Sequence, residues 1–281
     1  MNRREWRRVR SALMVGLVGA SVLLALLPLA LILANLLVKG AGSLDWAFFT
    51  RMPAPTGEEG GGVAHAIVGT LLIVGTASLI GLPLGIAAGI YCAEYPGTRL
   101  ATVTRFVADV MNGTPSIVVG VFAWAWIVAQ QKHFSAFAGS VALALLMVPM
   151  VLRTTEEMIK LVPHSLREAA LALGYPRWRT SLAIVVRTTL PGIVTGSLLA
   201  VARIAGETAP LLFTALGSQF LTARLDQPMA ALPLVVFTYA TGPFEEWHRL
   251  AWATALVLIL VVLVLSLAAR LATRRRFTPN G

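Results

Sequence analysis

Two arginines in apolar surroundings are the residues of this sequence best suited to chemistry. Arg203 lies in a long apolar run and Glu207 follows it by four residues, so on a helix the two side chains share a face and can pair. Arg153 ends another apolar run, with Glu156 and Glu157 three and four residues later. A charge at bilayer depth costs at least about 2.5–3.5 kcal/mol on insertion scales, so charges placed there usually serve a function.

The chemistry that these arginines offer is recognition of oxyanions. A guanidinium stays charged at any accessible pH, and its planar fork of donors fits the oxygens of phosphate and carboxylate groups. The structural alternative is that the ion pairs Arg203–Glu207 and Arg153–Glu157 only lock helices together. The residues leave both interpretations open. The two are compatible if the carboxylate holds the arginine until an anion competes for it.

These residues belong to a chain whose composition is typical of membrane proteins. Of its 281 residues, 57% are hydrophobic and 13% are charged, whereas soluble domains carry about 25% charged residues. A spanning helix needs about 20 apolar residues. Six stretches qualify, roughly 11–38, 63–92, 106–130, 136–155, 191–216 and 250–271. We therefore expect an all-α membrane protein with six transmembrane helices.

The distribution of positive charge predicts the orientation of these helices. The net charge is +10 and the chain has 23 Lys and Arg residues. When the six spans alternate across the membrane, the outside segments hold only Lys39, Arg51, Lys132, Arg224 and Arg249. The remaining cations, apart from Arg203 within its span, fall on the inside. The positive-inside rule then places the N- and C-termini in the cytoplasm, and this asymmetry argues against a nucleic-acid partner.

Helix-breaking residues at 111–116 interrupt the third apolar run. Gly113 frees the backbone and Pro115 removes an amide donor. Non-helical backbone at membrane depth is stable only inside protein or beside water. The segment either begins the third span or is an interrupted helix that lines a pathway. In the second case Thr114 and Ser116 are candidate pathway residues.

Glycines in the second apolar run indicate close packing of helices. Gly81, Gly85 and Gly89 recur at intervals of four, so they share one helix face. Small residues at this spacing allow two helices to approach closely in lipid. We interpret this face as structural.

The basic segment from about 156 to 190 contains a short amphipathic helix. Ser165 is a candidate N-cap with Glu168 three residues on, as in a capping box. The helix is expected over 166–173 and ends at Gly174, a common C′ residue. Its apolar face comprises Leu166, Ala169, Ala170 and Leu173. Such a helix lies either in the groove of a partner protein or on the lipid surface.

An enzymatic function lacks a recognisable site in this sequence. There is no GxxxxGK[ST] loop to cradle nucleotide phosphates, no HExxH and no GxSxG. The single Cys92 excludes an internal disulfide and a cysteine-based metal site. We expect a chain that is no enzyme and binds neither a metal nor a cofactor.

Taken together, these motifs resemble the permease subunits of binding-protein-dependent ABC importers, over almost the whole chain. The segments that carry the resemblance are 61–63, 66–70, 113–118, 153–157, 162–163, 168–174, 195–196 and 202–214. The last of them, which contains Gly206-Glu207-Thr208-Ala209-Pro210, is similar to PstA-type permeases of phosphate-specific importers. One departure is that Ile184-Val185-Val186-Arg187 stands where the general coupling motif has Ile-x-Leu-Pro.

The resemblance implies the permease fold of ABC type I importers and a place in the bacterial inner (plasma) membrane. It implies inorganic phosphate as substrate, and as partners a PstC-type sister permease, two ATP-binding subunits that use the ATP, and a periplasmic or extracellular phosphate-binding protein. By the same resemblance, Arg203 and Arg153 serve phosphate passage, with Glu207 as a partner. Glu156, Thr114 and Ser116 are further candidate pathway residues. The residues implied in ATPase coupling are Glu168, Ala169, Ala170 and Gly174.

The expected organisation has three parts. Residues 1–62 hold the N-terminal cytoplasmic segment, the first transmembrane helix and an outside loop. Residues 63–271 form the permease core with five transmembrane helices and the coupling loop, and 272–281 form a basic cytoplasmic tail. The alternatives for function are a permease for another oxyanion, such as sulfate or molybdate, and a structural or sensory membrane subunit that transports nothing.

Overall fold

The computed structural model of the protein describes residues 3–55, 58 and 60–274. Its elements are α1 (Arg3–Ala41), α2 (Trp46–Thr50), α3 (Ala64–Glu94), α4 (Arg99–Gly113), α5 (Ser116–Ala123), η1 (Trp124–Val128), α6 (Ala129–Gln131), α7 (Ala136–Lys160), α8 (His164–Ala172), α9 (Arg177–Arg179), η2 (Thr180–Val186), α10 (Arg187–Ile204), α11 (Ala209–Thr214), α12 (Leu232–Ala240) and α13 (Glu245–Arg274). The described residues form no strand beyond an isolated bridge between Pro53 and Gly61. The all-α prediction is therefore confirmed. Of the expected tail at 272–281, residues 275–281 lie outside the described part.

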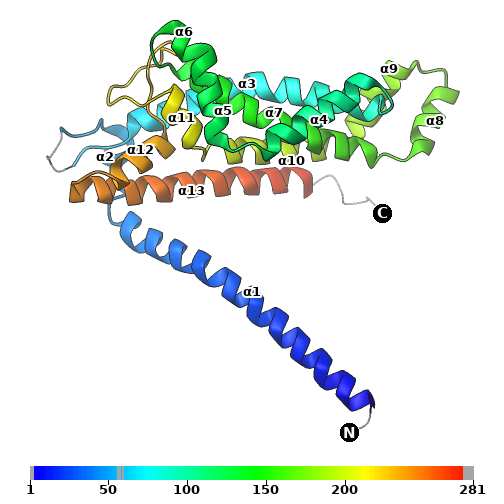
Figure 1. Ribbon diagram of the computed structural model, residues 1–281, viewed down its shortest axis with the longest axis horizontal. Coiled ribbons are helices and arrows are strands. Elements are labelled where there is room, and N and C mark those ends of the chain that lie inside the picture. The colour runs from blue at the N-terminus through cyan, green and yellow to red at the C-terminus, as the bar shows by residue number, and fades with distance from the viewer. Residues whose placement is uncertain (1–2, 56–57, 59, 275–281) are drawn as a thin grey trace.

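Among the described residues, five segments can cross a membrane by length and apolar composition, or six if a bent pair of helices counts as one span, compared with the six predicted. Five are stretches of continuous helix, namely α1, α3, α7, the run Arg177–Ile204 and α13. The sixth is a pair, Arg99–Gly113 with Ser116–Gln131, bent by 107° at the break between its halves. Helices α3, α7, α10 and α13 run along the long axis of the molecule (Figure 1). Within this bundle α7 contacts α3 and α10, and α10 contacts α13.

The bent pair decides between the two alternatives for residues 111–116, because it is an interrupted helix. α4 ends at Gly113 and α5 begins at Ser116. Pro115 occupies the N-cap of α5. Because proline has no backbone N–H, it cannot continue the hydrogen bonds of α4. Thr114 closes α4 by donating its hydroxyl to the carbonyl oxygen of Val110 at 2.7 Å.

The fifth span differs from the expected range of 191–216. Helical structure begins at Arg177, passes through the π-helical segment η2 and ends at Ile204. Arg203 therefore lies in the last turn of α10 rather than near the middle of a span. The cause is local: Gly206 has a low helix propensity, and Pro210, in the first turn of α11, cannot donate to a preceding turn.

The glycine face of α3 lies against α7, which confirms the packing predicted for Gly81, Gly85 and Gly89. A Cβ on Gly85 would lie 2.8 Å from the Cβ of Val151, and a Cβ on Gly89 would lie 2.6 Å from that of Thr155. Real Cβ atoms do not approach so closely, so these positions admit only glycine unless the helices separate. The pair α3–α7 forms the centre of the core, with Ile73, Leu143 and Met147 fully buried.

Helix α1 diverges from the bundle (Figure 1). It contacts α13 through its last turns, where Leu36 is buried and Gly40 faces the carbonyl oxygen of Trp252. From residue 10 to residue 35 every side chain is exposed. This span therefore leaves nearly its whole apolar surface free for lipid or another subunit.

Replacing Gly85 by Val should destabilise the bundle, because the added side chain must push α7 away from α3. Overpacking of this kind costs about 1–3 kcal/mol, and we expect a lower thermal unfolding midpoint for the detergent-solubilised protein. The matched control is Gly75→Ala in the same helix, since a Cβ at Gly75 meets no atom within 4 Å. Equal midpoints for the two variants would contradict the role given to the glycine face.

Candidate functional site

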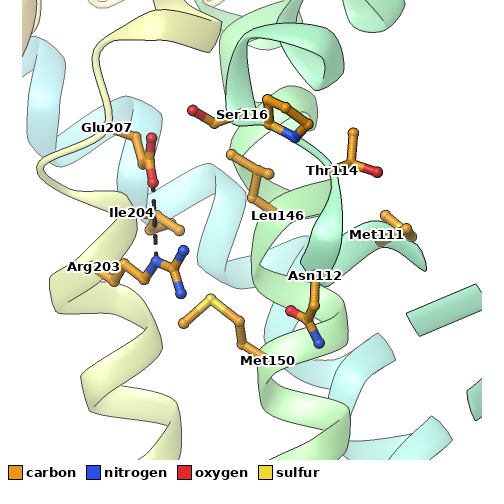
Figure 2. A pocket seen from close by; sticks show the side chains of 10 residues that line it. Met111, Asn112, Thr114, Ser116, Leu146, Met150, Arg203, Ile204 and Glu207 are labelled. Carbon is orange, nitrogen blue, oxygen red and sulfur yellow. Dashed lines mark ion pairs between the residues drawn. The ribbon is translucent and has the colours of Figure 1, made fainter. Parts of the chain in front are cut away.

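A cavity of about 200 Å³ lies where the interruptions of two spans meet. It is lined by Met111, Asn112, Thr114, Pro115, Ser116, Leu146, Met150, Arg203, Ile204 and Glu207. Figure 2 shows the Arg203 and Glu207 side chains on one wall, with Thr114, Ser116 and Asn112 across from them. Leu146 and Met150 of α7 form an apolar floor between these two groups. The cavity therefore joins one charged pair, hydroxyl groups and an amide.

Three helix ends bring these residues together. α4 ends at Gly113, α5 begins at Ser116 and α10 ends at Ile204. Of the residues expected along a pathway, the structure gathers Arg203, Glu207, Thr114 and Ser116 at one cavity, and Arg153 and Glu156 do not line it. Asn112 was missed as a lining residue, although its place in the polar break at 111–116 was a usable signal.

The Arg203–Glu207 pair is loose. The Nε atom of Arg203 lies 4.0 Å from Oε1 of Glu207, and the two side chains are 64% and 22% exposed. Within the part of the chain that the structure describes, the Arg203 guanidinium makes no hydrogen bond. An exposed pair of this kind contributes about 0–1 kcal/mol. Its donors are therefore free to bind an incoming anion.

Arg153 has a different environment. Its Nε donates to Oδ1 of Asp109 at 3.0 Å and its Nη2 to Oδ2 of the same carboxylate, so the pair is bidentate. Nη1 also reaches Oε2 of Glu156 at 3.4 Å. The alternative pair Arg153–Glu157 does not form in the structure, because Asp109 of α4 and the buried Glu156 occupy the guanidinium.

Glu156 is the most buried charged side chain in this region, with an exposed fraction of 1%. Nε of Arg105 and Nζ of Lys160 both donate to its Oε1 at 2.6 Å. Arg105 also donates to the carbonyl oxygens of Cys92 and Pro96. The carboxylate thus ties α7 to α4, and through Arg105 to the end of α3. Sequence reasoning missed Arg105 and Asp109, which are 51 and 44 residues from their partners in α7.

The short amphipathic helix is α8, and it begins earlier than predicted. Pro163 holds the N-cap position and Ser165 lies within the first turn, so the expected capping box with Glu168 does not form. Pro163 has the extended ψ of an N-cap residue, and because it has no N–H to donate, it suits the start of a helix. The helix therefore begins at His164, two residues before the predicted start.

The end of α8 is as predicted. Gly174 has φ +82°, and the N–H groups of Gly174 and Tyr175 donate to the carbonyl oxygens of Leu171 and Ala170. This is the Schellman arrangement, which favours glycine at the left-handed position. Ala170 faces the protein, whereas Leu166, Ala169, Leu173 and Glu168 are exposed. Most of the expected apolar face is thus available to a partner.

The sequence matches a family model described as "Binding-protein-dependent transport system inner membrane component" over residues 81–278. The phosphate transport system permease protein PstA of Yersinia pestis is 51% identical over 269 residues, which cover 95% of this chain and 91% of that protein. PstA of Haemophilus influenzae is 48% identical, covering 95% and 94% of the two chains. PstA 1 of Mycobacterium tuberculosis is 40% identical, covering 97% and 92%.

Solved structures give the fold. An inward-facing structure of the MetNI methionine ABC transporter matches with a TM-score of 0.65 at 17% identity, over 76% of this chain and 95% of that one. An amino acid ABC transporter with histidines matches with a TM-score of 0.58 at 16% identity, over 76% and 92%. These likenesses bear out the permease fold of ABC type I importers. The chain belongs to the family of binding-protein-dependent transport system inner membrane components and, within it, to the PstA proteins.

Proposed function

We propose that this chain is a transmembrane permease subunit of an ATP-driven importer of inorganic phosphate. The observation that carries the proposal is a loosely paired guanidinium that shares a cavity with the Thr114 and Ser116 hydroxyls, where the bent pair α4–α5 meets the end of α10. Near-full-length relatives named as phosphate transport permeases supply the identity of the anion.

The proposed anion site has donors of three kinds. The fork of Arg203 fits two phosphate oxygens. Ser116 supplies a hydroxyl donor, whereas the Thr114 hydroxyl lines the same cavity but already donates to the carbonyl oxygen of Val110. The N-terminus of α5 at Ser116 adds the favourable end of a helix dipole. A volume of about 200 Å³ admits a small oxyanion together with water, since one water occupies about 30 Å³.

Glu207 keeps this site weak. Its carboxylate shares the guanidinium before the anion arrives and repels a bound anion afterwards. Conduction requires binding that is favourable enough for entry and weak enough for exit. The cluster of Arg153, Glu156 and Asp109 has a positioning role. It fixes the orientation of α4, whose end forms one wall of the cavity.

The remaining assembly follows from the family. We propose that a PstC-type sister permease completes the pathway, that two ATP-binding subunits dock on the cytoplasmic side, and that a phosphate-binding protein delivers the anion from outside. The start of α1, the end of α13 and α8 all lie toward one end of the molecule (Figure 1), which we assign to the cytoplasm. Residues Glu168, Ala169, Ala170 and Gly174 then belong to the helix that contacts an ATP-binding subunit.

Arg203→Gln should abolish phosphate uptake and leave membrane insertion unchanged, because glutamine keeps the shape but loses the charge and the fork. Uptake of radiolabelled phosphate by the full assembly in proteoliposomes measures the effect. The control is Arg249→Gln, an exposed arginine paired with Glu246 at the start of α13, which should transport normally. Wild-type uptake by the Arg203 variant would remove this residue from the pathway, and equal competition by sulfate or molybdate would reassign the anion.

Exchanging the charges of the pair separates anion contact from helix locking. In the double variant Arg203→Glu with Glu207→Arg, an ion pair can still form, but the cation leaves its place at the end of α10. We expect a folded assembly without uptake. Retained uptake would instead favour a structural pair.

Gly174→Val should weaken coupling between ATP hydrolysis and uptake. A β-branched residue at φ +82° carries about 1–3 kcal/mol of backbone strain, and the end of α8 should loosen. The measurement is phosphate transported per ATP hydrolysed. Gly42→Val is the control, since Gly42 has neither a positive φ nor a neighbour within 4 Å of its added Cβ. Identical ratios for the two variants would mean that the end of α8 has no part in coupling.

A further inference from the structure

One arginine attaches α8 to two of the membrane-spanning helices. α8 packs against η2, and Nη1 of Arg167 forms an ion pair with Oε1 of Glu94, the last residue of α3. Nη2 of the same guanidinium donates to the carbonyl oxygen of Ile159 in α7 at 3.2 Å. Among the described residues this is the ion pair that joins α8 to a membrane-spanning helix. The fork thus connects α8 with the ends of α3 and α7 together.

Glu94 has a second partner on its other oxygen. The hydroxyl of Ser181 donates to Oε2 of Glu94 at 2.5 Å, so the carboxylate also binds η2. Both members of the ion pair are largely buried, with exposed fractions of 20% for Arg167 and 14% for Glu94. A carboxylate at a helix C-terminus is disfavoured by the helix dipole. Helix stability therefore does not account for Glu94, whereas the contacts with Arg167 and Ser181 do.

The same end of α3 is held from the opposite side by α4. Nη2 of Arg105 donates to the carbonyl oxygen of Cys92 at 2.5 Å, and its Nη1 donates to that of Pro96 at 3.2 Å. Its Nε binds Glu156 of α7. α4 then leads to the break at 113–115 that lines the Arg203 cavity. The connection therefore runs from α8 to the end of α3 through an ion pair, from there to Arg105 through two carbonyl hydrogen bonds, and along α4 to the wall of the cavity.

We propose that Arg167, Glu94 and Ser181, the α8 tether, transmit displacement of α8 to α3 and α4. The inference rests on the proposed function, in which an ATP-binding subunit moves α8. The exposed apolar side chains of α8 are left for that subunit, and α8 is attached to the bundle by Ala170, by its packing against η2 and by Arg167. A partly buried ion pair whose guanidinium also binds the carbonyl oxygen of Ile159 resists both rotation and separation, and salt screens it less than an exposed pair. Arg167 and Glu94 are then positioning residues that contact neither the ATPase nor the anion.

The test uses the full assembly of both permeases, the ATP-binding subunits and the phosphate-binding protein in proteoliposomes. For Glu94→Gln we expect the ATP-binding subunits to co-purify normally, while phosphate transported per ATP falls about tenfold, within the range of typical coupling free energies. Arg167→Lys should give an intermediate ratio, because lysine offers a point charge and cannot reach Glu94 and Ile159 in the same way. Glu246→Gln neutralises a carboxylate of the Arg249 pair at the opposite end and should leave the ratio unchanged.

The charge-swapped variant Glu94→Arg with Arg167→Glu covers the case in which Glu94→Gln fails to assemble. Recovery of assembly and of the transport ratio supports the tether, and an assembled but uncoupled swap overturns it. A normal ratio for Glu94→Gln also overturns it. These outcomes differ from failure of the proposed function, which would appear as a wild-type assembly that hydrolyses ATP without moving phosphate.

Discussion

Backbone hydrogen bonds that lipid cannot replace decide where this chain can be interrupted. Each N–H or C=O left unpaired in hydrocarbon costs several kcal/mol, so breaks in a span survive only inside protein or beside water. Here the breaks at 113–115 and 205–208 meet at one cavity instead of facing lipid at separate places. Residues of both breaks, Thr114, Pro115 and Glu207, line this cavity together with Arg203. The location of the site is therefore determined by this backbone constraint as well as by the side chains that line it.

The packing around the cavity is rigid on one side and adjustable on the other. Glycines bring α3 and α7 into backbone contact, and Glu156 fixes α4 to that pair through Arg105. α1, by contrast, is exposed from residue 10 to residue 35 and packs against α13 near its C-terminal end. Helices α3, α7 and α4 therefore form one stiff unit. Because closely packed interiors transmit strain, a displacement of α8 that moves this unit can reach the cavity without being absorbed by local rearrangement.

The sequence predicts contacts within one helix better than contacts between helices. The glycine face of α3, the left-handed Gly174 and the polar break before Ser116 follow from spacing and residue type, and the structure bears them out. The partners of Arg153 and Glu156 did not follow, because Asp109 and Arg105 lie on α4 and only the fold brings them near. The predicted end of the fifth span, residue 216, is also wrong, because the apolar composition continues past Ile204 whereas helix α10 ends there.

The two arginines that the sequence singles out differ in how readily they can exchange partners. Arg153 has a bidentate pair with the exposed Asp109 and a contact with the buried Glu156, and removing the partner of a buried charge costs about 3–5 kcal/mol. An anion at Arg203 displaces a contact worth about 0–1 kcal/mol, because Glu207 lies 4.0 Å away and makes no hydrogen bond to it. The two arginines therefore differ in role. Arg153 holds α4 against α7, whereas Arg203 is the cation that we propose a passing oxyanion binds, because its pair with Glu207 can open without disturbing the helices.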